Sequence, residues 1–187
     1  MACGVLGIQG DFAMHLEAIW RADPGVEGRL VKTPKDLETV DRLIIPGGES
    51  TTVGMLLSRF GLDQAICDRV KQGMPIWGTC MGMILLAAEI EGSQQPRLNL
   101  IEITVRRNAF GAQVHSFEDE VAVKGIAEDH LAVFIRAPIV TRLGEGVEAI
   151  AEYDGKIVGV RAAKVLATSF HPELTDDIRL HQFFLGL

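Results

Sequence analysis

The sequence lacks the segments that mark membrane and secreted proteins. None of its apolar runs approaches the length that spans a bilayer. Its first residues carry no basic segment and lead directly into a strand-like run, so we expect no signal peptide. The three cysteines form no Cys-x-x-Cys pair, and their odd number argues against a disulfide framework or a zinc site. We therefore expect a chain without a metal site that works in the reducing cytoplasm.

The chain also lacks any block of basic residues. Its net charge of −7 argues against general nucleic-acid binding and leaves small anionic or zwitterionic ligands open. Apolar residues make up 48% of the 187 residues and charged residues 23%, which is typical of a globular protein with one core. We find no internal repeat, and we predict a single domain over residues 1–187.

Strand-like and helix-like segments alternate in the first half of the chain. The patterns predict buried strands at 3–8, 28–31, 42–45 and 75–77, and helices at about 12–22, 50–60, 62–72 and 81–90. In the first helix, Phe12, Leu16, Ile19 and Trp20 fall on one face. This alternation predicts right-handed crossovers and a parallel sheet with helices on both faces.

Beyond a polar loop at 92–96 the pattern changes to short strands with tight turns. Strands are expected at 101–105, 120–123, 131–135, 139–143, 147–153, 157–160 and 165–170, followed by a closing helix at 176–184. Asp154-Gly155 predicts a hairpin between two of them. We expect an antiparallel extension of the same sheet rather than a second domain.

Cys80 stands between Gly78 and Gly82, where a predicted strand gives way to a helix. The pattern Gly-x-Cys-x-Gly is the thiol counterpart of a nucleophile elbow, in which small residues let strand and helix approach and the central side chain is held in a strained conformation. A thiol at a helix N-terminus is favoured as the thiolate. The alternative is that Cys80 is a small core residue, as free cysteines often are.

A cysteine nucleophile needs a base, and the base needs an orienting acceptor. His171-Pro172-Glu173 follows the last predicted strand, at the sheet edge where α/β proteins place their ligand sites. Pro172 keeps His171 extended, and residues two apart in an extended segment point to the same side, so Glu173 is expected beside the ring. The alternative is a surface turn with an incidental histidine.

The loop that starts at Pro46-Gly47-Gly48 follows another predicted strand and precedes a helix. Its two glycines leave backbone N–H groups free to approach a ligand, as an oxyanion hole requires, and the N–H of Met81 is a candidate second donor. A phosphate cradle lacks its Gly-Lys-Ser/Thr here, and a plain tight turn is the other alternative.

The remaining titratable residues carry no recognisable motif. Arg106, Arg107 and Arg136 are interpreted as solvated charges that matter only if a substrate carries a carboxylate. We expect surface or structural roles for His15, Glu17, His115, His130 and His181, and inert side chains for Cys3 and Cys67.

With these motifs assembled, the sequence resembles the class I, triad-type glutamine amidotransferases over essentially its whole length. Within that class it is similar to the glutaminase subunits of pyridoxal 5'-phosphate synthases. The matching runs are 4–12 (Gly-Val-Leu-Gly-Ile-Gln-Gly-Asp-Phe), 43–52 (Leu-Ile-Ile-Pro-Gly-Gly-Glu-Ser-Thr-Thr), 75–83, 135–138 (Ile-Arg-Ala-Pro) and 169–173 (Ser-Phe-His-Pro-Glu).

The resemblance implies a three-layer, flavodoxin-like fold of the class I glutamine amidotransferases and hydrolysis of L-glutamine to L-glutamate and ammonia. Cys80 would attack the side-chain amide carbon, and His171, oriented by Glu173, would protonate the departing ammonia. Water would then hydrolyse the glutamyl thioester. The resemblance implies an oxyanion hole from Gly47, Gly48 and Met81, and glutamine binding by Gly48, Glu49, Ser50, Arg107, Ile135 and Arg136.

The resemblance also implies a partner. Ammonia would pass through a channel to a separate barrel-shaped synthase subunit in a hetero-oligomer, and neither a cofactor nor a metal is expected in this chain. Docking would be sensed by the loop Gln9-Gly10-Asp11 and the Gly47-Gly48 peptide.

One segment departs from the family pattern, because Ala112 stands where an arginine is expected and His115 where an aspartate is expected. Three alternatives remain open at this point. The chain could serve another ammonia-using synthase, such as the one for imidazole glycerol phosphate. It could instead be a cysteine hydrolase or redox sensor of similar fold, or a non-catalytic binding module.

Overall fold

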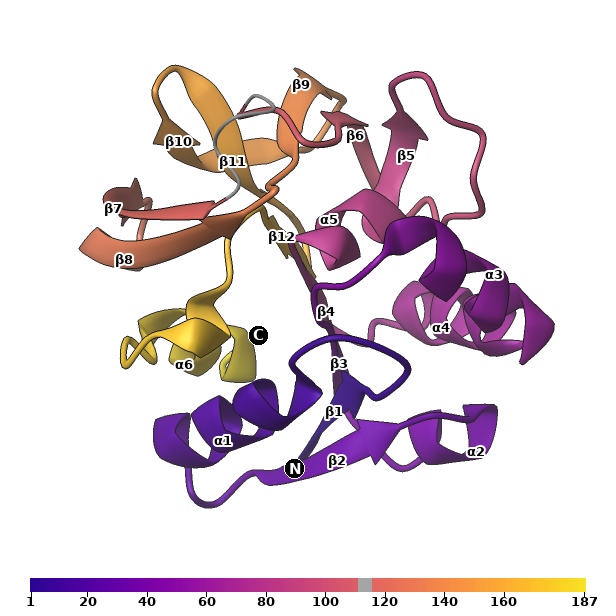
Figure 1. The fold of residues 1–187 in the computed structure, drawn as a ribbon. Coiled ribbons are helices and arrows are strands. Elements are labelled where there is room, and N and C mark those ends of the chain that lie inside the picture. Colours follow the sequence, from indigo (N-terminus) through magenta and orange to yellow (C-terminus); the bar gives the residue numbers. More distant parts are fainter. Residues whose placement is uncertain (111–115) are drawn as a thin grey trace.

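The structure is a computed structural model that describes residues 1–110 and 116–187, and its centre is a parallel sheet (Figure 1). In sheet order the parallel strands are β2 (Glu27–Val31), β1 (Ala2–Leu6), β3 (Arg42–Ile45), β4 (Ile76–Thr79) and β12 (Val165–Thr168). This order is the flavodoxin-like arrangement, in which ligands bind beyond the carboxyl ends of the strands. The predicted parallel sheet is confirmed.

The sheet continues past β12 with antiparallel strands. In order these are β11 (Lys156–Ala162), β10 (Glu148–Tyr153), β7 (Ser116–Val123) and β8 (Ala127–Ile135). A branch leads from β11 to β9 (Ile139–Leu143), then to β6 (Ile101–Arg106) and β5 (Ala87–Ile90). Asp154 and Gly155 turn between β10 and β11 with φ of 49° and 68°, the left-handed pair that a tight hairpin needs. The predicted antiparallel extension and its hairpin are confirmed.

Helices cover both faces of the sheet. They are α1 (Phe12–Ala22), α2 (Pro34–Leu37), α3 (Ser50–Arg59), α4 (Leu62–Lys71), α5 (Met81–Leu86), the 3₁₀ helix η1 (Pro172–Leu174) and α6 (Arg179–Leu185). Figure 1 shows α1 and α6 on one side of the parallel strands and α3, α4 and α5 on the other. Within β3, Leu43 and Ile45 join the core under α3 to α5, whereas Ile44 joins the core under α1 and α6.

Two expectations about helices are wrong. The predicted helix at 81–90 ends at Leu86, and Ala87–Ile90 form β5 alongside β6. A run that is apolar apart from Glu89 has no periodicity that separates a buried helix from a buried strand, and the partner strand comes from a later part of the chain. On α1, Trp20 is 64% exposed while His15 is fully buried, because the buried face is centred on His15, Ala18 and Ile19. None of the helices in the described ranges is long and apolar enough to cross a membrane.

Candidate active site

Cys80 occupies the turn between β4 and α5 with φ 50° and ψ −104°, a conformation that is strained for a residue with a side chain. The turn is held from behind, since the Cys80 N–H donates to the Thr168 carbonyl at 2.7 Å. A Cβ on Gly78 would lie 2.4 Å from the Gly82 carbonyl carbon, and one on Gly82 would lie 2.2 Å from the Ile45 oxygen. Both glycines are therefore required by the close approach of the two backbones.

His171 lies at the carboxyl end of the neighbouring strand β12, and its N–H donates to Val133 of β8 at 2.8 Å. Its Nδ1 lies 2.8 Å from Glu173 Oε1, so the predicted pair is brought together. The geometric reason differs from the prediction, because Pro172 starts the turn η1 instead of an extended segment. The turn places Glu173 beside the ring, and both side chains are buried.

The charges of this pair follow from their surroundings. Burial opposes a charged ring, but the adjacent Cys80 sulfur and the hydrogen bond to Glu173 outweigh it and raise the pKa of His171 to about 10. Burial also opposes a charged Glu173, but the adjacent rings of His15 and His171 lower the pKa of its carboxyl. At neutral pH His171 therefore carries a proton beside the sulfur, and Glu173 accepts from Nδ1 as a carboxylate.

A cavity of about 300 Å³ opens beside Cys80 and His171. Its lining includes every residue expected in the oxyanion hole or around glutamine, namely Gly47, Gly48, Glu49, Ser50, Met81, Arg107, Ile135 and Arg136. Gly10 and Asp11 of the expected docking loop line it as well. Ile84 and Asn108 also line the cavity and were missed, because neither stands in a motif that the sequence displays.

The Gly47-Gly48 peptide lies directly against the histidine. A Cβ on Gly47 would approach His171 Cε1 to 2.5 Å, and Gly48 has a φ of 147°. Gln9 holds the loop from the other side, because its Oε1 accepts the N–H of Glu49 at 2.7 Å. Met81 is the first residue of α5, so its N–H has no partner within the helix.

Three charged residues line the cavity, namely Glu49, Arg107 and Arg136, and each is held in a different way. The Glu49 carboxylate caps α3, and hydrogen bonds from the Thr52 side chain and from the N–H groups of Thr51 and Thr52 lower its pKa to about 2. Arg107 Nη1 donates to the buried Gln95 Oε1 at 3.0 Å, which fixes the guanidinium at the cavity. Arg136 has a φ of 46°, so strained backbone lies on this side of the cavity too.

Three histidines that were interpreted as surface or structural residues without partners are fully buried and have partners. His15, His130 and His181 are each 0% exposed, so the structural role fits them better than the surface role, and the expectation that they lack partners is wrong. His15 lies beside Glu173, and this contact has no sequence signal because α1 and η1 are far apart along the chain. Ala112 and His115 lie outside the described residues.

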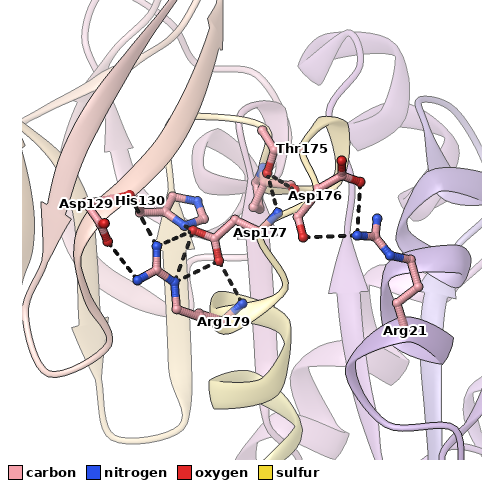
Figure 2. A network of polar contacts seen from close by, with 8 residues as sticks. Arg21, Asp129, His130, Thr175, Asp176, Asp177 and Arg179 are labelled. Atoms are coloured by element: carbon pink, nitrogen blue, oxygen red, sulfur yellow. Dashed lines mark hydrogen bonds and ion pairs between the residues drawn. The ribbon is translucent and has the colours of Figure 1, made fainter.

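The segment that follows η1 is fastened by a polar network (Figure 2). Asp177 accepts from Arg179 and contacts His130 Nδ1 at 2.8 Å, while Arg179 also reaches Asp129. Arg21 of α1 bonds to Asp176 in the same segment. This network ties β8, α1 and α6 together around the turn that carries Glu173.

Comparison with known proteins assigns the chain first to a class and then to a family. A solved structure described as a glutamine amidotransferase superimposes with a TM-score of 0.93 at 50% identity, covering 98% of this chain and 97% of that one. The fold is thus that of the glutamine amidotransferases. The chain belongs to the SNO glutamine amidotransferase family, whose model matches residues 5–186. It is an enzyme that hydrolyses glutamine.

Curated relatives match over their full length. The pyridoxal 5'-phosphate synthase subunit PdxT of Thermus thermophilus is 53% identical over 98% of this chain and 96% of its own length. The subunit of the same name from Herpetosiphon aurantiacus is 54% identical, with 100% of both chains covered. A structure of PurLQS from Thermotoga maritima, at 18% identity and a TM-score of 0.69, shares the fold, covering 99% of this chain and 97% of that one.

Proposed function

We propose that this chain is the glutaminase subunit of a pyridoxal 5'-phosphate synthase. The observation that carries the chemistry is the meeting of Cys80, His171 and the Gly47-Gly48 peptide at one cavity. The assignment to this pathway rests on relatives that are named as subunits of that synthase and are 53% and 54% identical over nearly the full length of both chains. Both relatives carry that name rather than the name of another ammonia-using synthase.

Cys80 is the proposed nucleophile. Its sulfur attacks the side-chain amide carbon of L-glutamine, and the proton held by His171 passes to the departing nitrogen, which leaves as ammonia. Water then attacks the glutamyl thioester while His171 accepts its proton, which releases L-glutamate and restores the thiol. Glu173 keeps Nδ1 of His171 protonated, so that Nε2 is the nitrogen that exchanges protons.

Backbone N–H groups of Gly47, Gly48 and Met81 are proposed to stabilise the oxyanion of each tetrahedral intermediate. Arg107 and Arg136 offer positive charge for the α-carboxylate of the substrate, while Ser50 and the Ile135 carbonyl offer polar contacts. Glu49 is proposed to hold the loop that binds glutamine, because its carboxylate caps α3 and its N–H donates to Gln9.

The partner is proposed to be a separate barrel-shaped synthase subunit that receives ammonia through a channel in a hetero-oligomer. Its docking is proposed to be sensed at Gln9-Gly10-Asp11. A Cβ on Gly10 would lie 2.0 Å from the Gly47 carbonyl oxygen, so the two loops are in close contact. A shift of the Gln9-Gly10-Asp11 loop would therefore move the Gly47-Gly48 peptide. We place this reaction in the reducing cytoplasm, since all three cysteines are free thiols.

The test is an assay of glutamate release from L-glutamine with and without the synthase subunit, run in parallel with an assay of pyridoxal 5'-phosphate. Wild type should release glutamate faster in the complex and support product formation, and Cys80→Ala should do neither. With free ammonium supplied, the Cys80→Ala complex should again form product, which separates loss of glutaminase from loss of assembly. Full glutaminase activity of Cys80→Ala would exclude the mechanism, and activation only by another synthase would exclude the pathway.

A further inference from the structure

A buried polar group lies behind the carboxylate of Glu173. His15 from α1, His181 from α6 and Thr79 from β4 are each 0% exposed. His15 Nε2 lies 3.3 Å from Glu173 Oε2 and 3.3 Å from Thr79 Oγ1, and His15 Nδ1 lies 3.1 Å from His181 Nε2. The oxygen of Glu173 that does not serve His171 therefore faces a second imidazole.

The neighbours of His15 indicate which ring nitrogen carries its hydrogen. An ionised carboxylate only accepts hydrogen bonds, and an unprotonated ring nitrogen 3.3 Å away would repel it, so Nε2 carries the hydrogen. Burial lowers the pKa of both His15 and His181, which keeps the two rings neutral. Nδ1 of His15 is then an acceptor, and Nε2 of His181 is the donor. This line of contacts therefore runs from His181 Nε2 through the His15 ring to His15 Nε2, which lies 3.3 Å from both Thr79 Oγ1 and Glu173 Oε2.

We propose that His15 is a positioning residue that holds the Glu173 carboxylate through Oε2 while Oε1 receives the N–H of His171. A carboxylate held at one oxygen can rotate about its last bond, whereas one held at both oxygens keeps Oε1 aimed at Nδ1. Within the described ranges Oε2 forms no hydrogen bond, and His15 Nε2 lies 3.3 Å from it. The 3.3 Å contact is long for an N–H···O bond, as catalytic hydrogen bonds often are before substrate binds.

His181 orients the ring of His15 through the contact between its Nε2 and His15 Nδ1. Its Nε2 is held against His15, and its Nδ1 is buried without a hydrogen-bond partner among the described residues, which suits a ring nitrogen that carries no hydrogen. The ring also packs edge-on against Trp77, with centroids 4.9 Å apart. His181 thus fixes the orientation of His15 from a position that touches neither the cavity nor Glu173.

The inference rests on the catalytic roles proposed above, and a pair of amide substitutions tests it. In His15→Gln the side-chain amide reaches the place of Nε2 and can still donate to Glu173, whereas in His15→Asn it reaches only the place of Nδ1. In the assembled complex, His15→Asn should lower kcat at least about 10-fold with KM within about threefold of wild type. His15→Gln should stay within about threefold in both constants.

A matched control separates positioning from general damage to the core. His130 is equally buried and bonds to Asp177 rather than to Glu173, so His130→Gln removes a buried imidazole without touching the proposed line. Its kcat should remain within about twofold of wild type even if its thermal stability falls. Equal kcat values for His15→Gln and His15→Asn, or a loss confined to KM, would overturn the proposal. Either outcome would leave the proposed glutaminase chemistry standing, provided that Cys80→Ala lacks activity.

A measurement on the wild-type protein keeps the proposal testable if a variant does not fold. Nitrogen-15 NMR of labelled histidines distinguishes the two neutral tautomers. His15 should carry its hydrogen on Nε2 at neutral pH and show an unprotonated Nδ1. Observation of the opposite tautomer would overturn the proposal, because Nε2 could then donate nothing to Glu173.

Discussion

At the residue scale, some site residues show a local pattern and others show none. Cys80 could be found because Gly78 and Gly82 flank it, and the structure shows that each added Cβ would meet backbone. The pairing of His171 with Glu173 could be predicted because the two residues stand two positions apart in the chain. His15 could not be found, since its contact with Glu173 exists only after α1 packs against η1. Long-range contacts of single side chains leave no periodic signal.

The charge of His171 predicts how stability depends on pH. The folded-state pKa of about 10 lies above the ordinary value of 6.5, so the ring stabilises the fold fully below about pH 6.5 and this contribution is lost as pH rises through about 10. Urea unfolding at pH 7 and pH 10 should show the stability difference between wild type and His171→Gln shrinking by more than about 1 kcal/mol.

The control for this titration is His130→Gln. Burial lowers the pKa of His130, so that ring stays neutral over the whole interval from pH 7 to pH 10. The stability difference between wild type and His130→Gln should therefore be constant over that interval. A constant difference for His171→Gln as well would show that the ring is not charged in the folded protein.

At the scale of elements, the alternation of strands and helices predicted the sheet, while the end of α5 was beyond prediction. The run from Met81 to Ile90 is apolar apart from Glu89, and only pairing with β6 makes its last four residues a strand. The same limit applies to η1. An extended segment was expected there and the structure has a 3₁₀ turn, but the expected pairing of His171 with Glu173 is present. Tertiary contacts decide local structure where the sequence has no periodic pattern.

The contact between α5 and β3 predicts the effect of one methyl group. A Cβ on Gly82 would lie 2.2 Å from the Ile45 carbonyl oxygen, so Gly82→Ala should cost about 3 kcal/mol of unfolding free energy, measured in urea. Gly186→Ala is the matched control, because the nearest atom to its added Cβ is 3.4 Å away. The control should change stability by less than about 0.5 kcal/mol. Equal stabilities of the two variants would contradict the described contact.

The polar network behind η1 predicts a second pH effect, of opposite sign. Partial burial opposes a charged Asp177, but hydrogen bonds from Arg179 outweigh it and lower its pKa to about 2. Its contribution is present above the ordinary value near 3.8 and is lost as pH falls through about 2. Asp177→Asn should therefore be less stable than wild type at pH 5, by about 1 kcal/mol after solvent screening, and equally stable near pH 2.

Asp176→Asn serves as the control for that series, because the Asp176 side chain is fully exposed and solvent screens its ion pair with Arg21. Its thermal unfolding curve should follow wild type at every pH. A pH-independent gap between Asp177→Asn and wild type would show that the carboxylate charge does not hold this segment.

At the scale of the whole molecule, the order of elements was sufficient to predict the architecture. A parallel sheet, covering helices and an antiparallel extension were all expected, because crossover rules leave few topologies for such a pattern. The branch through β9, β6 and β5 was not expected in detail, since strand pairing at that distance depends on side-chain packing.

The synthase subunit is proposed to dock on the surface that includes the loop Gln9-Gly10-Asp11, and one charge reversal tests this location. Asp11 and Asp23 are both exposed aspartates that flank α1, and only Asp11 lines the cavity. Asp11→Arg should weaken binding of the synthase subunit at least about 10-fold, measured by isothermal calorimetry. Asp23→Arg should leave binding unchanged. Equal binding by both variants would place the interface elsewhere.

The central claim is that Cys80 is the nucleophile that attacks glutamine, and an electrophilic diazoketone analogue of glutamine tests it most directly. Cys3 and Cys67 are internal controls, because burial raises the pKa of Cys3 to about 12 and also raises that of Cys67. Peptide mass spectrometry of the labelled complex should place the adduct on Cys80 alone, and excess L-glutamine should prevent it. Labelling of another cysteine, or labelling that glutamine does not slow, would contradict the account.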